Sequence, residues 1–204
     1  MTNNPSLTSV TLEVDDLDDA RRFYTAFGVA DRVRLRAGTA PTSGFRGFDL
    51  ALVVPGPSTV DGFVSTAVEA GATVVKPAAK SLWGYGAVVQ APDGTLWNIS
   101  SSSKKDDGRD TRRIDEFVLL IGVEDVKATK RLYSERGLAV GKSFGSKYVE
   151  FKDDGAPVKL ALYKRSGLAK VLGVPAEGSG SHRLVVGGAL GDFTDPDGFV
   201  WEAA

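Results

Sequence analysis

Residues 10–29 read VTLEVDDLDDARRFYTAFGV, and residues 119–138 read LLIGVEDVKATKRLYSERGL. The two segments align at a constant offset of 109 residues, which places Asp16 opposite Asp125. In each copy apolar residues alternate over the first positions, as they do along a half-buried strand. An Asp suited to cap a helix follows the strand, and a glycine suited to end the helix closes the segment. The repeated unit is therefore a strand, a capped helix and a glycine stop.

A second phrase also occurs twice, as PDGTLWN ending at Asn98 and as PDGFVWE ending at Glu202. Pro, Asp and Gly in this order favour a tight turn, and the residues after it predict a strand. Side chains alternate along a strand, so Trp97 and Trp201 must point away from the polar residues that follow them. We expect both tryptophans in the core and both polar residues on the opposite face.

The repeats divide the chain into two similar halves, residues 1–101 and residues 114–204, joined by a polar and charged linker at 102–113. The first half has a long helical pattern, STVDGFVSTAVEAG, after the strand FDLALVV. The second half has two strands, KYVEF and VKLALYK, and only the short helical segment GLAKVLGV. Because each half lacks elements that the other has, we expect them to pack as one unit and to unfold in one transition.

Composition excludes several classes of protein. The chain has 204 residues with 25 basic and 26 acidic side chains, and the resulting net charge of −1 argues against a nucleic-acid partner. No apolar run approaches the roughly 18 residues of a membrane span, and the first residues lack the pattern of a signal peptide. The absence of cysteine excludes disulfides and thiolate metal sites. We expect a soluble, cytoplasmic monomer or homodimer.

In their order and duplication these motifs resemble the vicinal oxygen chelate superfamily. That superfamily includes glyoxalase I, the bleomycin resistance proteins, fosfomycin-resistance enzymes and extradiol dioxygenases. The resemblance is carried by the two PDG-x-x-W phrases, the WGY at 83–85, and the residues Asp16, Leu17, Phe23, Tyr24 and Gly28. It implies an α+β fold of two glyoxalase-like halves, built of βαβββ-type modules whose curled mixed sheets surround a cleft with helices outside. Activity stays open, since one fold hosts many chemistries.

The resemblance also implies positions for a metal site. Carried over to this sequence, these positions are Ser9, Asp49 and Asn98 in the first half and Val118, Arg183 and Glu202 in the second, with His182 as an alternative to Arg183. Neutral Ser and Asn are poor ligands, Val cannot coordinate, and Arg is a permanent cation. A divalent metal would need Asp49, His182 and Glu202 to be pooled, so we expect no cofactor. We expect Glu202 to pair with Arg183 across the cleft floor instead.

Two functions are compatible with this pattern. The first is a non-metal binding protein, similar to the bleomycin-resistance branch, that holds a small aromatic or hydrophobic molecule in the cleft. Arg183 would then fix a carboxylate or phenolate of the ligand. The candidate cleft residues are Ser9, Thr11, Asp49, Asn98, Val118, Arg183 and Glu202, with Phe45, Trp83 and Tyr85 at the rim.

The alternative is a glyoxalase-like lyase or dioxygenase-type enzyme. It would use a reduced divalent-metal site, or Glu202 and His182 as acid and base. A histidine beside the apolar strand LVV is more often a hydrogen-bonded structural residue than a catalytic base. Metal content separates the two functions, because a metal-dependent enzyme should retain metal and lose activity in chelator.

Overall fold

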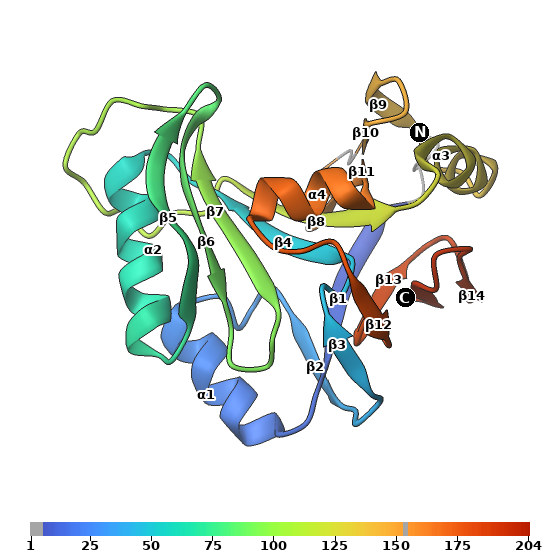
Figure 1. Ribbon diagram of the computed structural model, residues 1–204, viewed down its shortest axis with the longest axis horizontal. Helices are drawn as coiled ribbons and strands as arrows, with labels where there is room; N and C mark the ends of the chain where they lie inside the picture. Colours follow the sequence, from blue (N-terminus) through green and yellow to red (C-terminus); the bar gives the residue numbers. More distant parts are fainter. Residues whose placement is uncertain (1–5, 153–154) are drawn as a thin grey trace.

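A computed structural model describes residues 6–152 and 155–204 (Figure 1). The first half forms β1 (Leu7–Val14), α1 (Leu17–Phe27), β2 (Arg34–Ala37), β3 (Thr42–Gly44), β4 (Phe48–Val53), α2 (Pro57–Glu69), β5 (Thr73–Ser81), β6 (Gly84–Gln90) and β7 (Leu96–Ser101). The second half forms β8 (Glu116–Val123), α3 (Val126–Glu135), β9 (Val140–Phe144), β10 (Tyr148–Phe151), β11 (Lys159–Lys164), α4 (Arg165–Leu172), β12 (Gly178–Gly180), β13 (Leu184–Gly188), β14 (Phe193–Thr194) and β15 (Val200–Ala203). Among the described residues, no helix is long and apolar enough to cross a membrane.

The repeated segment folds as its sequence predicts. The side chain of Asp16 accepts hydrogen bonds from the backbone N–H groups of Asp18 and Asp19 at the start of α1, both at 2.9 Å. Asp125 caps α3 in the same way. Helix α1 ends at Gly28, whose φ of +86° is left-handed and so favours glycine. The strand, the capped helix and the glycine stop are confirmed in both halves.

Every sheet combines strands from both halves. The largest has eight strands in the order β5-β6-β7-β4-β8-β11-β10-β9, the second has five in the order β14-β15-β13-β1-β2, and β12 pairs with β3. The first strand of each half therefore lies in a sheet with strands of the other half: β1 pairs with β13, and β8 pairs with β4. The predicted α+β fold class is confirmed, and within residues 6–152 and 155–204 neither half has a sheet of its own.

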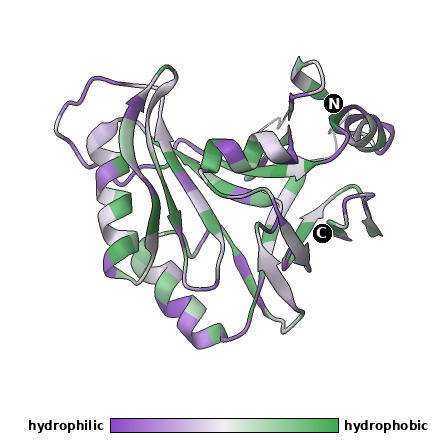
Figure 2. Ribbon diagram, viewed as in Figure 1, coloured by the Kyte–Doolittle hydropathy of each residue, from purple (hydrophilic) through white to green (hydrophobic). Residues whose placement is uncertain are grey.

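The two large sheets share one continuous hydrophobic core, which also takes in the apolar sides of α1, α2 and α3. Trp97 and Trp201 are 0% and 1% exposed, so the prediction that both tryptophans belong to the core is confirmed. Each tryptophan packs against the tyrosine of the repeated helix, with ring centroids 5.8 Å apart for Tyr24 and 4.9 Å apart for Tyr133. Hydrophilic residues are interspersed with hydrophobic ones along α1 and α2 (Figure 2). This pattern is typical of helices that bury one side against a core and expose the other.

The turns with the sequence Pro-Asp-Gly help to hold the repeated helices against the sheets. The Tyr24 hydroxyl donates to Asp93 of the first turn at 2.6 Å. In the second half the Tyr133 hydroxyl donates at 2.5 Å to Asp195, two residues before the corresponding Asp. Asp197 itself accepts the backbone N–H of Glu124, just before α3, at 2.9 Å. The repeated phrase therefore has a structural role in both halves.

Residues 102–113 form no helix or strand and follow the outside of α2. They make polar contacts with the start of that helix: the Ser58 hydroxyl donates to Asp106 at 2.7 Å, and the Thr59 hydroxyl donates to the carbonyl of Arg109 at 3.2 Å. The Arg112 guanidinium donates to the carbonyl of Phe27 at 3.1 Å. This segment is hydrophilic along most of its length (Figure 2).

Helix α4 differs from the other helices in its position. It lies on the face of the eight-stranded sheet opposite the main core, where Leu168, Ala169 and Leu172 pack against Val88 and Leu96. Figure 1 shows α4 lying across β8 and β4, away from α1 and α2. The resemblance implies helices on the outer face only, whereas here a short helix lies on the cleft side of the sheet.

Candidate functional site

The predicted site positions fall on two different sheets. Asp49, Asn98 and Val118 lie on the eight-stranded sheet, where Ala51 is the neighbour of both Asn98 and Val118. Of the other three positions, Ser9 and Glu202 lie on the five-stranded sheet, and Arg183 directly precedes its strand β13. The sequence analysis grouped these positions by half of the chain, and that grouping is wrong. Each sheet takes its strands from both halves, so positions from different halves lie side by side.

The expected ion pair between Glu202 and Arg183 is also wrong. Glu202 lies opposite Gly187, four positions along β13 from Arg183, which is a separation of roughly 13 Å along the strand. Glu202 instead accepts a hydrogen bond from Arg36 at 2.9 Å. The Arg183 guanidinium makes an ion pair with Asp15 at 2.9 Å, and this bond holds the pKa of Asp15 below its usual value.

A second contact of Arg183 goes to the backbone, since its Nε donates to the carbonyl of Ala40 at 2.8 Å. Only 10% of the Arg183 side chain is exposed. Ser9 and Thr11 lie on the face of the five-stranded sheet that is opposite the main core, next to Gly187 and Val185 of β13, and Ser9 is buried there. The arginine expected to hold a ligand is thus already engaged within the protein.

His182 is held as a structural residue. Its ring stacks on Phe199 with centroids 3.8 Å apart, its Nε2 lies 2.9 Å from the carbonyl oxygen of Asp197, and its Nδ1 contacts the carbonyl oxygen of Arg46. Glu202 lies on β15 and is engaged with Arg36. The structure therefore does not bring the proposed acid and base together.

The three aromatic rim candidates lie in three different environments. Phe45 is only 5% exposed and packs in the same cluster as α4. Tyr85 points to the opposite face of the sheet, where its hydroxyl donates to Asp61 of α2 at 2.8 Å. Its prediction as a cleft residue is wrong. Trp83 is 85% exposed in the turn between β5 and β6.

The face of the eight-stranded sheet that carries α4 is called the cleft face below. Side-chain alternation places Leu96 and Asn98 of β7, Asp49 of β4, and Val118 and Leu120 of β8 on this face. Asp49 lies between Leu96 and Leu120 in the sheet, and both leucines contact the apolar cluster of α4. Asn98 and Val118 lie one row further along and are partly exposed.

Asp49 is the most unusual residue on the cleft face. It is 0% exposed, and neither carboxylate oxygen has a hydrogen-bond partner within residues 6–152 and 155–204. Burial raises the pKa of Asp49 well above its ordinary value of 3.8, because an apolar environment disfavours the charged form. Tyr163 is half-buried on β11, two strands from β4, and burial together with the nearby Asp49 carboxyl raises the pKa of its hydroxyl.

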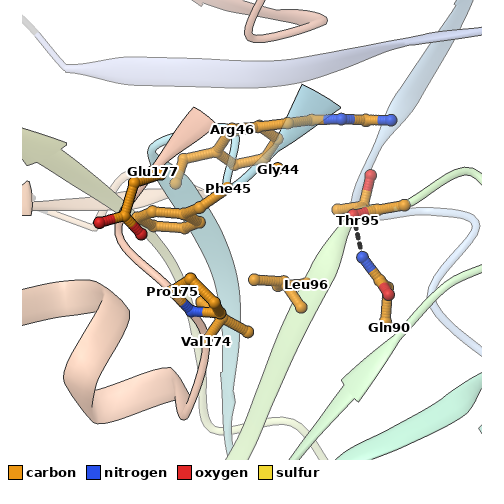
Figure 3. A pocket seen from close by; sticks show the side chains of 11 residues that line it. Gly44, Phe45, Arg46, Gln90, Thr95, Leu96, Val174, Pro175 and Glu177 are labelled. Carbon is orange, nitrogen blue, oxygen red and sulfur yellow. Dashed lines mark hydrogen bonds between the residues drawn. The ribbon is translucent and has the colours of Figure 1, made fainter. Parts of the chain in front are cut away.

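A cavity of about 280 Å³ opens beside the C-terminal end of α4. Its walls come from both halves, and its lining residues are Gly44, Phe45, Arg46, Phe48, Gln90, Gly94, Thr95, Leu96, Val174, Pro175 and Glu177. Figure 3 shows Phe45, Val174 and Pro175 on one side of this space, Gln90 and Thr95 on the other, and Leu96 between them.

The polar groups around the cavity are few. Burial lowers the pKa of the Arg46 guanidinium from its usual value, and one of its nitrogens donates to the carbonyl of Asp93. The Gln90 side chain donates to the carbonyl of Gly94 at 3.2 Å. Glu177 is exposed on the opposite wall.

The sequence reasoning identified only Phe45 among the residues that line this cavity. Arg46 stands beside Phe45 in GFRGF, where aromatic residues lie among glycines, and this pattern could have pointed to Arg46. Gln90 precedes the first Pro-Asp-Gly turn by two residues, so the position of that turn could have pointed to Gln90. Val174 and Pro175 carry no signal of this kind, because only the packing of α4 brings them to the cavity.

A metal site does not fit the side chains present. Among the described residues there is no group of three or more His, Cys, Asp and Glu side chains that could hold a metal ion. Asp49 has two leucines as its sheet neighbours, and Glu202 is engaged with Arg36 on the other sheet. Val118 offers no donor atom.

No family model matches this sequence, and no curated protein matches it either. Solved structures do match. Glyoxalase I from Zea mays is similar with a TM-score of 0.63 and 15% identity, over 98% of this chain and 92% of that one. A candidate dioxygenase from Bacillus subtilis is similar with a TM-score of 0.57 and 13% identity, over 97% of this chain and 73% of that one. The chain therefore has the two-module vicinal oxygen chelate fold.

Proposed function

We propose that this protein binds a small molecule with an aromatic or hydrophobic body on the cleft face, without a metal. The cavity of about 280 Å³ carries this proposal. Phe45, Leu96, Val174 and Pro175 give it an apolar wall, while only a few polar groups surround it. Mostly apolar concavities with a small number of polar groups are typical of small-molecule sites.

Arg46 takes over the role that the sequence assigned to Arg183. Arg46 lines the cavity and Arg183 does not, although one guanidinium nitrogen of Arg46 also donates to the carbonyl of Asp93. A guanidinium forms strong, charge-assisted hydrogen bonds with a carboxylate or phenolate. The proposed ligand therefore has an aromatic or hydrophobic body and an acidic group that reaches Arg46.

The test uses benzoate as the probe and amide chemical shifts of isotope-labelled protein as the readout. We expect saturable shifts at residues 44–48, 94–96 and 174–177, which surround the cavity. Val174→Trp should abolish them by filling the space, because Val174 lines the cavity. Val171→Trp is the matched control, since Val171 is 42% exposed on α4 and does not line the cavity.

A third variant tests the acidic group. Arg46→Gln should weaken the binding of benzoate by about tenfold, the effect of losing one hydrogen bond to a charged group. It should leave the binding of benzyl alcohol, which has no charge, unchanged. Benzoate shifts that are absent, or equal in Val174→Trp and Val171→Trp, would refute the proposed function.

A further inference from the structure

We infer that α4 is a lid on the cleft face, and that in the ligand-bound form it is raised so that a hydroxyl or amino group of the ligand donates a hydrogen bond to Asp49. The role of Asp49 rests on the proposed binding function. The movement of α4 is independent of it and is tested without a ligand.

The first observation is the unpartnered carboxyl of Asp49. It is completely buried, and the structure provides no donor for either oxygen from any described residue. Leaving a buried acceptor without a partner costs free energy that an apolar residue at the same position would not. A ligand donor would supply the missing hydrogen bond, and it can reach the carboxyl only from the cleft face.

The second observation is what covers that face. Asp49 lies between Leu96 and Leu120, and the apolar side chains of α4 pack against this pair. Leu168 reaches to the neighbouring row, where its methyl group would lie 3.3 Å from a Cβ added at Gly122. Helix α4 thus lies over this part of the cleft face together with Tyr163 of β11, which is close to Asp49.

The third observation is that α4 can leave without disturbing the main core. Its buried residues belong to a separate, smaller cluster, whereas the main core lies on the other face of the sheet. The helix has eight residues, and no side chain in the described part of the chain caps its N-terminus. Gly167 in its first turn lowers its helix propensity further. Short helices with few buried contacts open locally at low cost.

Two side-chain hydrogen bonds attach α4 to the sheet side. Arg165 donates to the carbonyl of Phe45, and Lys76 of β5 donates to the carbonyl of Val171 at 3.2 Å. Beyond α4 the chain passes through Gly173, whose φ is +80°, to Val174 and Pro175 at the cavity. The cavity therefore lies at the edge of the lid, where opening would extend it toward Asp49.

The natural chain has no cysteine, so a single introduced thiol reports local opening. Ala169→Cys places the thiol on the buried side of α4, and Ala67→Cys places it on the buried side of α2; the two alanines are 1% and 0% exposed. We expect a thiol reagent in native buffer to label the protein at position 169 faster than at position 67 by about 100-fold or more, because α2 belongs to the main core. Equal labelling rates at positions 169 and 67 would overturn the proposal that α4 is a lid.

The role of Asp49 is tested with two isomeric probes, benzyl alcohol and anisole, of which only the first has a hydrogen-bond donor. We expect benzyl alcohol to bind several-fold more tightly than anisole, and Asp49→Ala to remove this difference. Binding should also accelerate labelling at position 169. Equal affinities in the natural protein, or an unchanged ratio in Asp49→Ala, would overturn the role of Asp49. If neither probe binds, the role of Asp49 fails, while benzoate still decides the proposed function and the labelling rates still decide the lid.

Discussion

Replacing Asp49 with asparagine is expected to stabilise the protein at neutral pH. The two side chains have nearly the same shape, and both would be buried without a partner, so those costs cancel between variant and natural protein. What remains is the cost of keeping the aspartic acid protonated. Its ordinary pKa is 3.8, which is 3.2 units below pH 7.0. At about 1.36 kcal/mol per unit, the cost at pH 7 reaches about 4 kcal/mol at most.

The pH dependence has a defined sign. In the unfolded chain the carboxyl loses its proton near pH 3.8, whereas burial keeps it protonated to a higher pH in the folded protein. The folded state therefore binds more protons above pH 3.8, and stability falls as the pH rises toward the raised pKa. The Asp49→Asn variant has no carboxyl at this position, so its stability does not fall with pH in this way. We expect the two proteins to have similar stability near pH 4 and the variant to be more stable at pH 7.

Urea unfolding at pH 4, 5, 6 and 7 measures this difference directly. We expect a gain at pH 7 that stays within the limit of about 4 kcal/mol, and each kcal/mol should raise Tm by about 2 to 4 °C. Asp31→Asn is the control, because Asp31 is exposed and its replacement should change stability by less than about 0.5 kcal/mol at any pH. An Asp49→Asn variant that is less stable than the natural protein at pH 7 would refute the reasoning.

Three further predictions concern the fold. Tyr133→Phe removes the buried hydrogen bond to Asp195 and should cost about 1 to 3 kcal/mol in urea unfolding, while an unchanged midpoint would contradict this. Gly178→Ala should cost about 1 to 3 kcal/mol, because its Cβ would overlap the backbone of Phe45; Gly167→Ala has open space and should instead gain about 0.5 to 1 kcal/mol. Calorimetry of the natural protein should show one transition, since every sheet joins both halves, and two separated peaks would count against it.

Much of the fold could be predicted because the chain repeats its strongest signals. Two copies of a strand, a capped helix and a glycine stop identify the modules, and alternation after each turn places Trp97 and Trp201 in the core. The prediction for Tyr85 failed for another reason. Tyr85 lies among glycines in LWGYG, which is typical of a loop, but it belongs to strand β6 and its hydroxyl donates to Asp61 of α2.

The site was predicted less completely than the fold. Periodicity indicates which face a residue occupies, but it does not indicate which strand lies alongside, so the pairing of β1 with β13 and of β4 with β8 was missed. The ion pair expected for Arg183 failed for the same reason, since register decides its distance from Glu202. The segment that forms α4 is recognisably helical, yet its position on the cleft face depends on packing that no local pattern contains.

The exchange of strands between the halves has a practical consequence for protein engineering. A break in the polar segment 102–113 would leave two fragments, each with unpaired strand edges that match the other fragment. Such fragments should regain structure only when they meet. Fused to two other proteins, they would act as a split sensor of proximity whose signal is the recovery of the buried fluorescence of Trp97 and Trp201.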